Sequence, residues 1–239
     1  MGRKLVKRSM KKIAILQSSY IPWKGYFDII NSVDEFIIYD DAQFTRRDWR
    51  NRNIVKTKNG LKWLTIPIEV KGKYNQRIKD AKIANKEWAS KHWQTIKHNY
   101  NSATYFKEYK ELFERSFQLC KKLDFLSDVN RLFIDLVNSI LEINTPIKNS
   151  SEYNLEGNKS ERIVSICRQS KAEIYLSGPT AKNYLDRKLF SEAGIFIEWV
   201  NYDNYTEYKQ LYPPFEHSVS IIDLIFNIGV NTPLFMNSF

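Results

Sequence analysis

Two short apolar segments near the start of the chain constrain its fold more than any other feature. Lys12–Gln17 and Glu35–Tyr39 each have the length and apolar content of a strand that is buried on both faces. Between them, Gly25–Ser32 has the apolar spacing of a short helix. A strand, a helix and a strand within about thirty residues are typical of a right-handed βαβ unit with parallel strands. The sequence therefore predicts an α/β fold with a mostly parallel, Rossmann-like sheet.

The rest of the chain divides into an α/β part and a helical part. Residues 86–145 contain three segments with helical spacing, whereas strand candidates return after Pro146, at Glu173–Ser177 and Ile195–Val200. We therefore expect an α/β core formed by residues 10–85 and 146–239, from both ends of the chain, with residues 86–145 as a helical insertion. Residues 1–9, which are basic, are expected to be a disordered extension.

Three shorter segments carry weaker patterns. The Asn59-Gly60 dipeptide lies between two strand candidates and is suited to a tight hairpin turn. Gln76–Ala84 has a weak strand pattern, and Lys182–Ala193 has helical spacing. We expect a hairpin, a strand and a helix, respectively.

The charge of the chain is strongly basic and unevenly distributed. The formal net charge is +10, and residues 45–62 contain seven Lys and Arg residues against Asp48 alone. Such a surface either is simply solvated or binds an anion, for example the phosphates of a nucleotide, a nucleotide sugar or RNA.

Several classes of protein are disfavoured by composition. No apolar run approaches the roughly 18 residues of a membrane-spanning helix, and the basic N-terminus lacks the apolar stretch of a secretory signal. Cys120 and Cys167 lie in apolar segments and suggest no disulfide framework, and the presence of only three histidines disfavours a His-rich metal site. We expect a cytoplasmic protein with no membrane span and assign no metal ligands.

The loop after the first strand is the first candidate site. Loops at the carboxyl ends of parallel strands are where α/β proteins bind phosphates and nucleotides. In this loop Gln17, Trp23, Gly25 and Tyr26 are candidate substrate-binding residues. The alternative is a connector whose aromatic side chains cover the sheet.

The second candidate site follows the second strand. Asp40 and Asp41 are candidate catalytic residues, because adjacent carboxylates bind Mg²⁺ or Mn²⁺, or one of them acts as a general base if its pKa is raised. Arg side chains that follow can contact phosphates in a bidentate manner. The alternative is a structural network in which Asp and Arg neutralise each other. The candidate substrate-binding residues of this segment are Gln43, Arg46, Trp49, Arg50, Asn51, Arg52 and Asn53.

Two further regions contribute candidates. Gly178, Tyr184 and Asp186 follow a later strand and are expected to complete a pocket, or else to form a capped turn. His217 is the histidine least tied to helical spacing and is a candidate catalytic residue, although a lone histidine is more often structural.

These motifs, taken together, resemble the WbqC-like family. The matching segments run in order along the chain: QSSYIPWKGYFDII (17–30), DEFIIYDDAQ (34–43), WRNRN (49–53), WLTIP (63–67), YLSG (175–178), NYLD (183–186) and SIIDLIFNIG (220–229). One departure is Ser18-Ser19-Tyr20, where the resemblance leads us to expect Pro and further aromatic residues. The family is associated with bacterial surface-polysaccharide synthesis, including O-antigen, lipopolysaccharide and capsule.

The resemblance implies a cytosolic transferase that moves an acyl or aminoacyl group to the amine of a nucleotide-linked amino sugar. In this interpretation Arg50 and Arg52 hold the diphosphate, aromatic residues stack on the base or sugar, and Asp40 or Asp41 deprotonates the amine. The expected partners are a nucleotide sugar and an activated acyl donor, such as aminoacyl-tRNA. The sequence identifies no cofactor and no oligomeric state. Two alternatives are a metal-dependent glycosyltransferase that uses Asp40-Asp41 and an RNA-binding or scaffold protein without catalytic activity.

Overall fold

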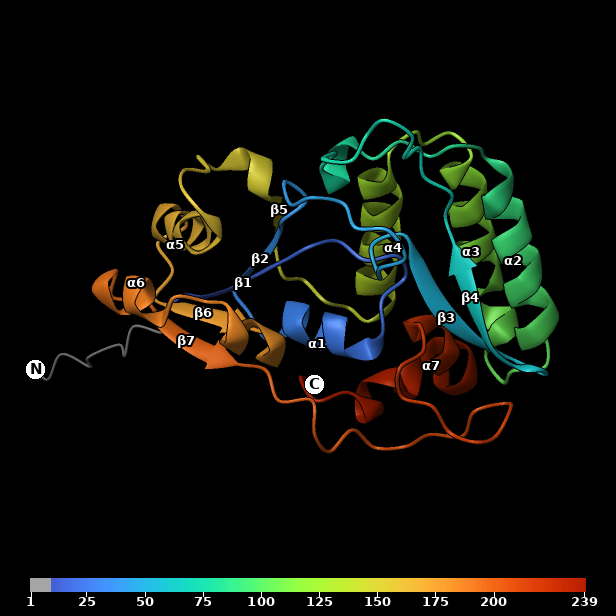
Figure 1. Cartoon of the computed structure of the whole chain (residues 1–239). Coiled ribbons are helices and arrows are strands. Elements are labelled where there is room, and N and C mark those ends of the chain that lie inside the picture. The colour runs from blue at the N-terminus through green and yellow to red at the C-terminus, as the bar shows by residue number, and fades with distance from the viewer. Residues whose placement is uncertain (1–9) are drawn as a thin grey trace, which may run out of the picture. The chain divides into compact units, whose positions relative to one another are not determined.

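The computed structural model describes residues 10–239 and forms two compact units (Figure 1). Unit 1 comprises the described residues up to Leu16 together with Val33–Ile38 and Thr145–Asn201. Unit 2 comprises Gln17–Ser32, Tyr39–Asn144 and Tyr202–Phe239. The expected extension of residues 1–9 lies outside the described residues.

Unit 1 is built on a five-stranded sheet whose strands are all parallel, with the order β5-β2-β1-β6-β7. The strands are β1 (Lys12–Leu16), β2 (Glu35–Ile38), β5 (Ile147–Asn149), β6 (Ile174–Ser177) and β7 (Phe196–Trp199). β1 lies at the centre, where Ile13 pairs with Glu35 of β2 and with Tyr175 of β6. The predicted parallel, Rossmann-like α/β sheet with strands from both ends of the chain is confirmed.

The helices of unit 1 begin at side-chain caps. Asn158 accepts hydrogen bonds from the main-chain N–H groups of Ser160 and Glu161, and α5 (Lys159–Gln169) follows. Asp186 accepts from the N–H of Lys188 and starts α6 (Arg187–Glu192). The prediction of one continuous helix from Lys182 to Ala193 is wrong, because Asp186 is extended and caps a new helix after a separate 3₁₀ helix (Pro179–Asn183).

Unit 2 contains a β-hairpin and most of the helices. The hairpin pairs β3 (Arg52–Thr57) with β4 (Gly60–Thr65) and turns at Lys58-Asn59, as Asn59-Gly60 predicts; Gly60 has a φ of 99°, which favours glycine. The helices are α1 (Lys24–Asn31), α2 (Glu87–Tyr100), α3 (Phe106–Cys120), α4 (Leu126–Ile140) and α7 (Ile221–Ile228), and a 3₁₀ helix (Gly229–Phe235) follows α7. Residues 86–145, predicted as a helical insertion, thus contain α2, α3 and α4, which share unit 2 with the hairpin and α7.

Aromatic rings fill the space between the helices of unit 2. Phe226 of α7 contacts Tyr100, Phe106 and Phe113, with ring centroids 5.7, 5.0 and 5.2 Å away. Phe117 of α3 lies 4.9 Å from Phe133 of α4. Burial of such large apolar side chains is the main favourable term in folding, so this core holds the helices against one another.

Segment 76–84 differs from its predicted strand. Ile78–Asp80 forms a 3₁₀ helix, and the strand pairing around it is limited to isolated bridges at Arg77, Lys82 and Ile83. No helix of the described chain is both long enough and apolar enough to cross a membrane.

Candidate functional site

A buried carboxylate, that of Asp40, organises the loop that follows β1. Its Oδ1 accepts a hydrogen bond from the Ser18 main-chain N–H at 2.8 Å, and its Oδ2 accepts one from the Ser18 hydroxyl at 2.7 Å. The amide of Asn130 on α4 donates to the Ser18 hydroxyl at 2.8 Å and to the main-chain oxygen of Arg50 at 3.0 Å. Because Leu16 of β1 lies opposite Ile38 of β2, the chain leaves the two strands at the same edge of the sheet. Asp40 and the loop are therefore held in one fixed arrangement.

The environment of Asp40 raises its pKa. Burial is the largest cause, since only 5% of the residue is exposed, and the neighbouring Asp41 carboxyl adds to the rise. The Ser18 hydrogen bonds and the Arg50 guanidinium oppose it without cancelling it. A raised pKa is the property that the sequence interpretation required of a general base at this position.

Arg50 joins Asp40 and the loop. Its Nη1 donates to the main-chain oxygen of Gln17 at 3.5 Å, an oxygen that also accepts from the Tyr26 hydroxyl at 3.2 Å. Arg50 Nε lies 3.7 Å from a carboxylate oxygen of Asp48 but has no hydrogen-bond acceptor among the described residues. The predicted site residues Gln17, Tyr26, Asp40 and Arg50 thus come together.

Asp41 has different partners from Asp40. Its carboxylate forms ion pairs with Lys79 at 2.5 Å and with Arg77 at 3.4 Å, and its side chain is 8% exposed. Within residues 10–239, no cluster of three or more His, Cys, Asp or Glu side chains could hold a metal ion. The geometry therefore separates the two adjacent carboxylates, and Asp40 is the one without a cation in direct ion-pair contact in the described chain.

A pocket of about 260 Å³ lies at the end of a short segment that starts with a turn at Asp40 and Asp41. The Lys79 N–H donates to Asp40 O, the Ile78 N–H to Ala42 O and the Phe44 N–H to Gln76 O, so that 40–44 runs alongside 76–79. Four extended residues span at most about 14 Å. The pocket is lined by Gln43, Phe44, Thr45, Arg46, Val70, Lys73, Tyr74 and Gln76.

Two predicted site residues, Gln43 and Arg46, line this pocket together with six residues that were not predicted as site residues. Gln43 donates to the main-chain oxygen of Tyr74 at 3.1 Å, which fixes that wall. Tyr74 is 87% exposed, and Gln76 Oε1 is buried without a donor in the part of the chain that is described. The pocket thus offers two cations, Arg46 and Lys73, an aromatic face and an unused acceptor, and the Lys73 ammonium forms an ion pair with Glu69 at 2.5 Å.

Asn51 and Asn53 are engaged with the main chain. The Asn51 amide donates to Ile66 O at 2.9 Å, and the Asn53 amide donates to Tyr20 O at 3.0 Å and Ile21 O at 2.8 Å. Ile21 has a φ of 40°, a left-handed conformation that an isoleucine adopts only when its surroundings hold it. Asn53 therefore braces the loop after β1, whereas Asn51 holds the chain that follows β4; the binding role predicted for them stays a prediction.

Trp49 and Arg52 lie at the hairpin with Trp63, a residue that the sequence interpretation named only as part of a motif. The indole rings of Trp49 and Trp63 are 5.2 Å apart, and the Arg52 guanidinium lies 4.0 Å from the Trp63 ring centroid. Trp49 and Trp63 are 40% and 41% exposed. Arg50 and Arg52 thus have different neighbours, the loop after β1 and an aromatic ring, respectively.

Trp23 and Gly25 form a packed unit at the start of α1. The Trp23 ring meets Tyr202 and Tyr205 edge-on at 5.0 and 5.6 Å, and a Cβ at position 25 would overlap it. The absence of a side chain at Gly25 is therefore explained by close packing against Trp23.

Lys24, which the sequence interpretation passed over, is buried beside this unit. Its ammonium donates to the main-chain oxygens of Phe235 at 3.1 Å and Thr206 at 3.4 Å and lies 4.4 Å from the Tyr205 ring centroid. Burial lowers its pKa to about 8. The sequence signal was a lysine at the start of a largely apolar helix.

His217 lies among aromatic rings, with Phe215 at 4.6 Å and Tyr205 at 6.5 Å. Burial and the nearby Lys24 charge lower its pKa, and its Nδ1 is buried without a hydrogen-bond partner in the described chain. The ring is therefore a neutral base, and the catalytic role predicted for it stays a prediction.

Gly178, Tyr184 and Asp186 belong to unit 1. Gly178 follows β6, Tyr184 is 62% exposed, and Asp186 caps α6. The capped turn that was the alternative interpretation is present; the predicted contribution of these residues to a pocket stays a prediction.

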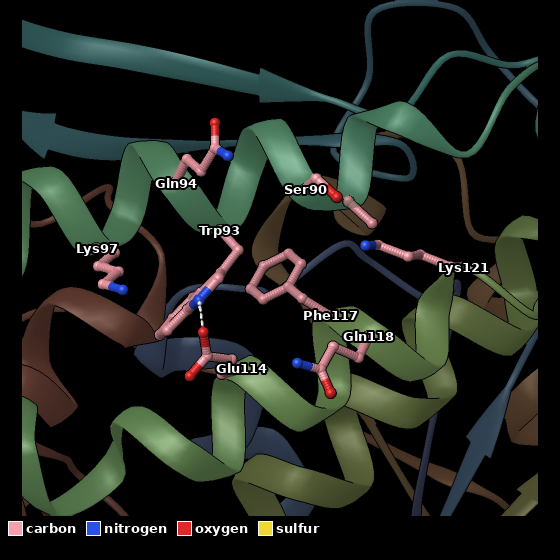
Figure 2. Close-up of a pocket in the computed structure, with 9 residues that line it drawn as sticks. Ser90, Trp93, Gln94, Lys97, Glu114, Phe117, Gln118 and Lys121 are labelled. Atoms are coloured by element: carbon pink, nitrogen blue, oxygen red, sulfur yellow. Dashed lines mark hydrogen bonds between the residues drawn. The ribbon is translucent and has the colours of Figure 1, made fainter.

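A second pocket, of about 250 Å³, lies between α2 and α3 (Figure 2). Trp93 and Phe117 stack at its centre, and the Trp93 indole N–H donates to Glu114 at 3.0 Å. None of the residues predicted from the sequence lines it.

Comparisons with known proteins give one family and one relative. The model of the WbqC-like protein family matches residues 17–234. An uncharacterized protein of Mycobacterium tuberculosis, Rv1507c, is 46% identical over 224 residues, which cover 94% of this chain and 96% of the relative. No solved structure matches the chain.

Proposed function

Since this chain belongs to the WbqC-like protein family, we propose that it is a transferase of surface-polysaccharide biosynthesis that acts in the cytoplasm. It transfers an acyl or aminoacyl group to the amine of a nucleotide-linked amino sugar. The observation that carries the proposal is the meeting of Gln17, Asp40 and Arg50, in which a carboxyl group of raised pKa lies beside a guanidinium.

Asp40 supports the chemistry as a general base. A sugar amine is protonated near neutral pH and has to lose a proton before its lone pair attacks an acyl carbonyl. In the transfer, a C–N bond forms and the bond between the acyl carbon and its carrier breaks. The nitrogen of the protonated amine loses two protons: one is released to water before the attack, and the other passes through Asp40 to the departing carrier. A carboxylate whose pKa is raised holds that proton better than an ordinary aspartate.

The pocket at residues 43–76 supports recognition of the anionic substrate. Arg46 and Lys73 supply two cations for a diphosphate, and Tyr74 supplies an exposed ring on which a base or sugar stacks. The pocket is at most about 14 Å of extended chain from Asp40. A nucleotide sugar that holds its phosphates in this pocket extends its sugar along residues 40–44 toward the carboxyl group.

The acyl group arrives on an activated carrier, for which the basic residues 45–62 favour a polyanion such as aminoacyl-tRNA. Of the two alternative functions, the metal-dependent glycosyltransferase loses support because Asp41 is already bound to Lys79 and Arg77. A metal ion that coordinates the diphosphate of the substrate and is held by Asp40 and Asp41 has to displace these two ion pairs.

The test is a reaction panel. The protein is incubated with nucleotide-linked amino sugars, and with the matching hydroxy sugars as controls, in the presence of aminoacyl-tRNA and other activated acyl donors. Mass spectrometry is expected to detect an added acyl group only on an amino sugar, and chelation of metals is expected to leave the rate unchanged. Transfer of the sugar itself, or loss of activity on chelation, would contradict the proposal.

A further inference from the structure

The hairpin of unit 2 exposes an aromatic surface that the transfer chemistry does not use. Trp49 and Trp63 are 40% and 41% exposed, and their rings lie 5.2 Å apart at an angle of 41°. We call these two residues together with Arg52 the tryptophan platform. Adjacent indole rings that remain in water forgo the free energy of burial, which marks such a surface as an interaction site.

The hairpin register explains why Arg52 lies beside Trp63. Trp63 pairs with Ile54 and Thr65 pairs with Arg52, so that Arg52 is a diagonal neighbour of Trp63 on one face of the hairpin. The Arg52 guanidinium lies 4.0 Å from the Trp63 ring centroid, and its Nε has no hydrogen-bond acceptor among residues 10–239. The guanidinium is therefore held against the Trp63 ring by a cation–π contact.

The stretch of chain that carries the platform is cationic. Arg46, Arg47, Lys58 and Lys62 are all exposed in the same stretch of chain. The single acid of residues 45–62, Asp48, is already used, because it accepts hydrogen bonds from the Thr45 hydroxyl at 2.6 Å and the Trp49 N–H at 2.7 Å. Residues 45–62 therefore carry more positive charge than their single acid can neutralise.

We propose that the tryptophan platform binds single-stranded RNA. Unpaired bases stack on Trp49 and Trp63, while Arg52 and the surrounding lysine and arginine side chains contact the phosphates. Exposed aromatic rings within a basic surface are the means by which proteins hold single strands. A neutral glycan would use the rings but would have no use for the surrounding cations.

This inference deepens the proposed function without depending on it. If the acyl donor is carried by RNA, the platform is where the unpaired end of that RNA binds, close in sequence to Arg50. If the transfer reaction proves to be different, the platform and its charge remain. Binding of RNA and binding of a nucleotide sugar are therefore measured separately.

The experiment uses fluorescence anisotropy of a labelled single-stranded RNA of about 12 nucleotides, and a duplex of the same sequence, between 50 and 200 mM salt. We expect Trp63→Ala and Trp49→Ala each to weaken binding of the single strand by about tenfold and Trp63→Phe to restore most of it, because phenylalanine still stacks. Leu112→Ala, which removes an equally exposed apolar side chain from α3, is the matched control and is expected to bind as the unaltered protein does. Circular dichroism establishes that each variant is folded.

Charge is tested in the same assay. Lys62→Gln is expected to weaken binding and to make it less dependent on salt, whereas Lys122→Gln, an exposed lysine beyond the end of α3, is expected to change neither. Equal losses for the two lysine variants, or equal affinity for single strand and duplex, would show attraction of any polyanion and overturn the proposal. Binding like that of the unaltered protein by folded Trp63→Ala and Trp63→Phe would overturn it as well. Calorimetry measures the affinity of Trp63→Ala for a nucleotide-linked amino sugar, which is expected to be unchanged. This measurement tests the proposed function independently of RNA binding.

Discussion

The Ser18 hydroxyl lies 2.7 Å from one oxygen of Asp40, and the Ser18 main-chain N–H lies 2.8 Å from the other. One residue of the loop after β1 thus satisfies both oxygens of a carboxylate that is 5% exposed. This relationship fixes the orientation of Asp40 and, with burial, sets its proton affinity. Both consequences can be measured.

Asp40→Asn is expected to lower the turnover of acyl transfer about a hundredfold or more, because an amide cannot take up the proton of the amine. The substitution preserves shape, and the Asn oxygen still accepts from the Ser18 N–H, so binding of the nucleotide sugar is expected to change little. In the unaltered protein, kcat/KM is expected to rise with pH, with an apparent pKa above that of an ordinary aspartate. This rise in kcat/KM is expected to be absent from the variant. Unchanged turnover in the folded variant would exclude Asp40 as the base.

The pH dependence of stability provides a second test at the same residue. A carboxyl whose folded pKa is raised makes the folded state bind more protons than the unfolded state, so its contribution to the free energy of unfolding falls as pH rises through the folded pKa. Urea unfolding of Asp40→Asn and the unaltered protein is therefore expected to show the variant gaining relative stability as pH rises from about 4 to 7. A constant difference across this range would contradict the raised pKa.

Arg46→Ala is expected to weaken binding of a nucleotide sugar by about tenfold, in keeping with the loss of a hydrogen bond to a charged group, which contributes about 1.5–3 kcal/mol. Its effect on kcat is expected to be small, because Arg46 lines the pocket and does not contact the Asp40 carboxyl group. Arg115→Ala is the matched control, since Arg115 is an exposed arginine of α3 that pairs with Glu111. Calorimetry measures both; equal binding by both variants would place the phosphates elsewhere.

The strands of the sheet could be predicted because parallel strands buried on both faces are continuous apolar runs, which Lys12–Leu16 and Glu35–Ile38 display in their own sequence. β5 could not, because it has three residues and pairs with only one neighbour. The 3₁₀ helix at Ile78–Asp80 was also missed, because its conformation depends on hydrogen bonds to Asp40 and Ala42 far away in the chain.

The site residues also divide into those that local sequence predicts and those that depend on contacts between distant parts of the chain. Asp40 and Gln17 were predicted because their positions follow from where two strands end. Asn130 was not, because its contact with Ser18 joins residues 112 positions apart; the available signal was a polar residue in the apolar stripe of α4. Lys73 and Tyr74 were missed for the same reason, since hydrogen bonds between segments far apart in the chain bring them to Gln43.

The buried ammonium of Lys24 predicts a distinct pH dependence of stability. Its folded pKa of about 8 lies below that of a lysine in an unfolded chain, so between pH 8 and about 10 the unfolded state binds more protons. The contribution of Lys24 to the free energy of unfolding therefore rises with pH in this window. Lys24→Met keeps the aliphatic stem and removes the charge. Urea unfolding at pH 7.5 and 9.5 is expected to show the variant losing stability relative to the unaltered protein at the higher pH, and an identical difference at the two pH values would contradict the lowered pKa.

Gly25→Ala is expected to destabilise the folded protein by about 1–3 kcal/mol, the usual cost of adding atoms to a packed interior. The new methyl group would overlap the Trp23 ring, which is itself held between Tyr202 and Tyr205. If that overlap is the cause, the cost depends on the ring: in a Trp23→Leu background, Gly25→Ala is expected to cost less than half as much. A double-mutant cycle measured by urea unfolding gives the coupling between the two positions. Simple additivity would mean that Gly25 is required for a reason other than Trp23, such as the approach of a substrate to the main chain.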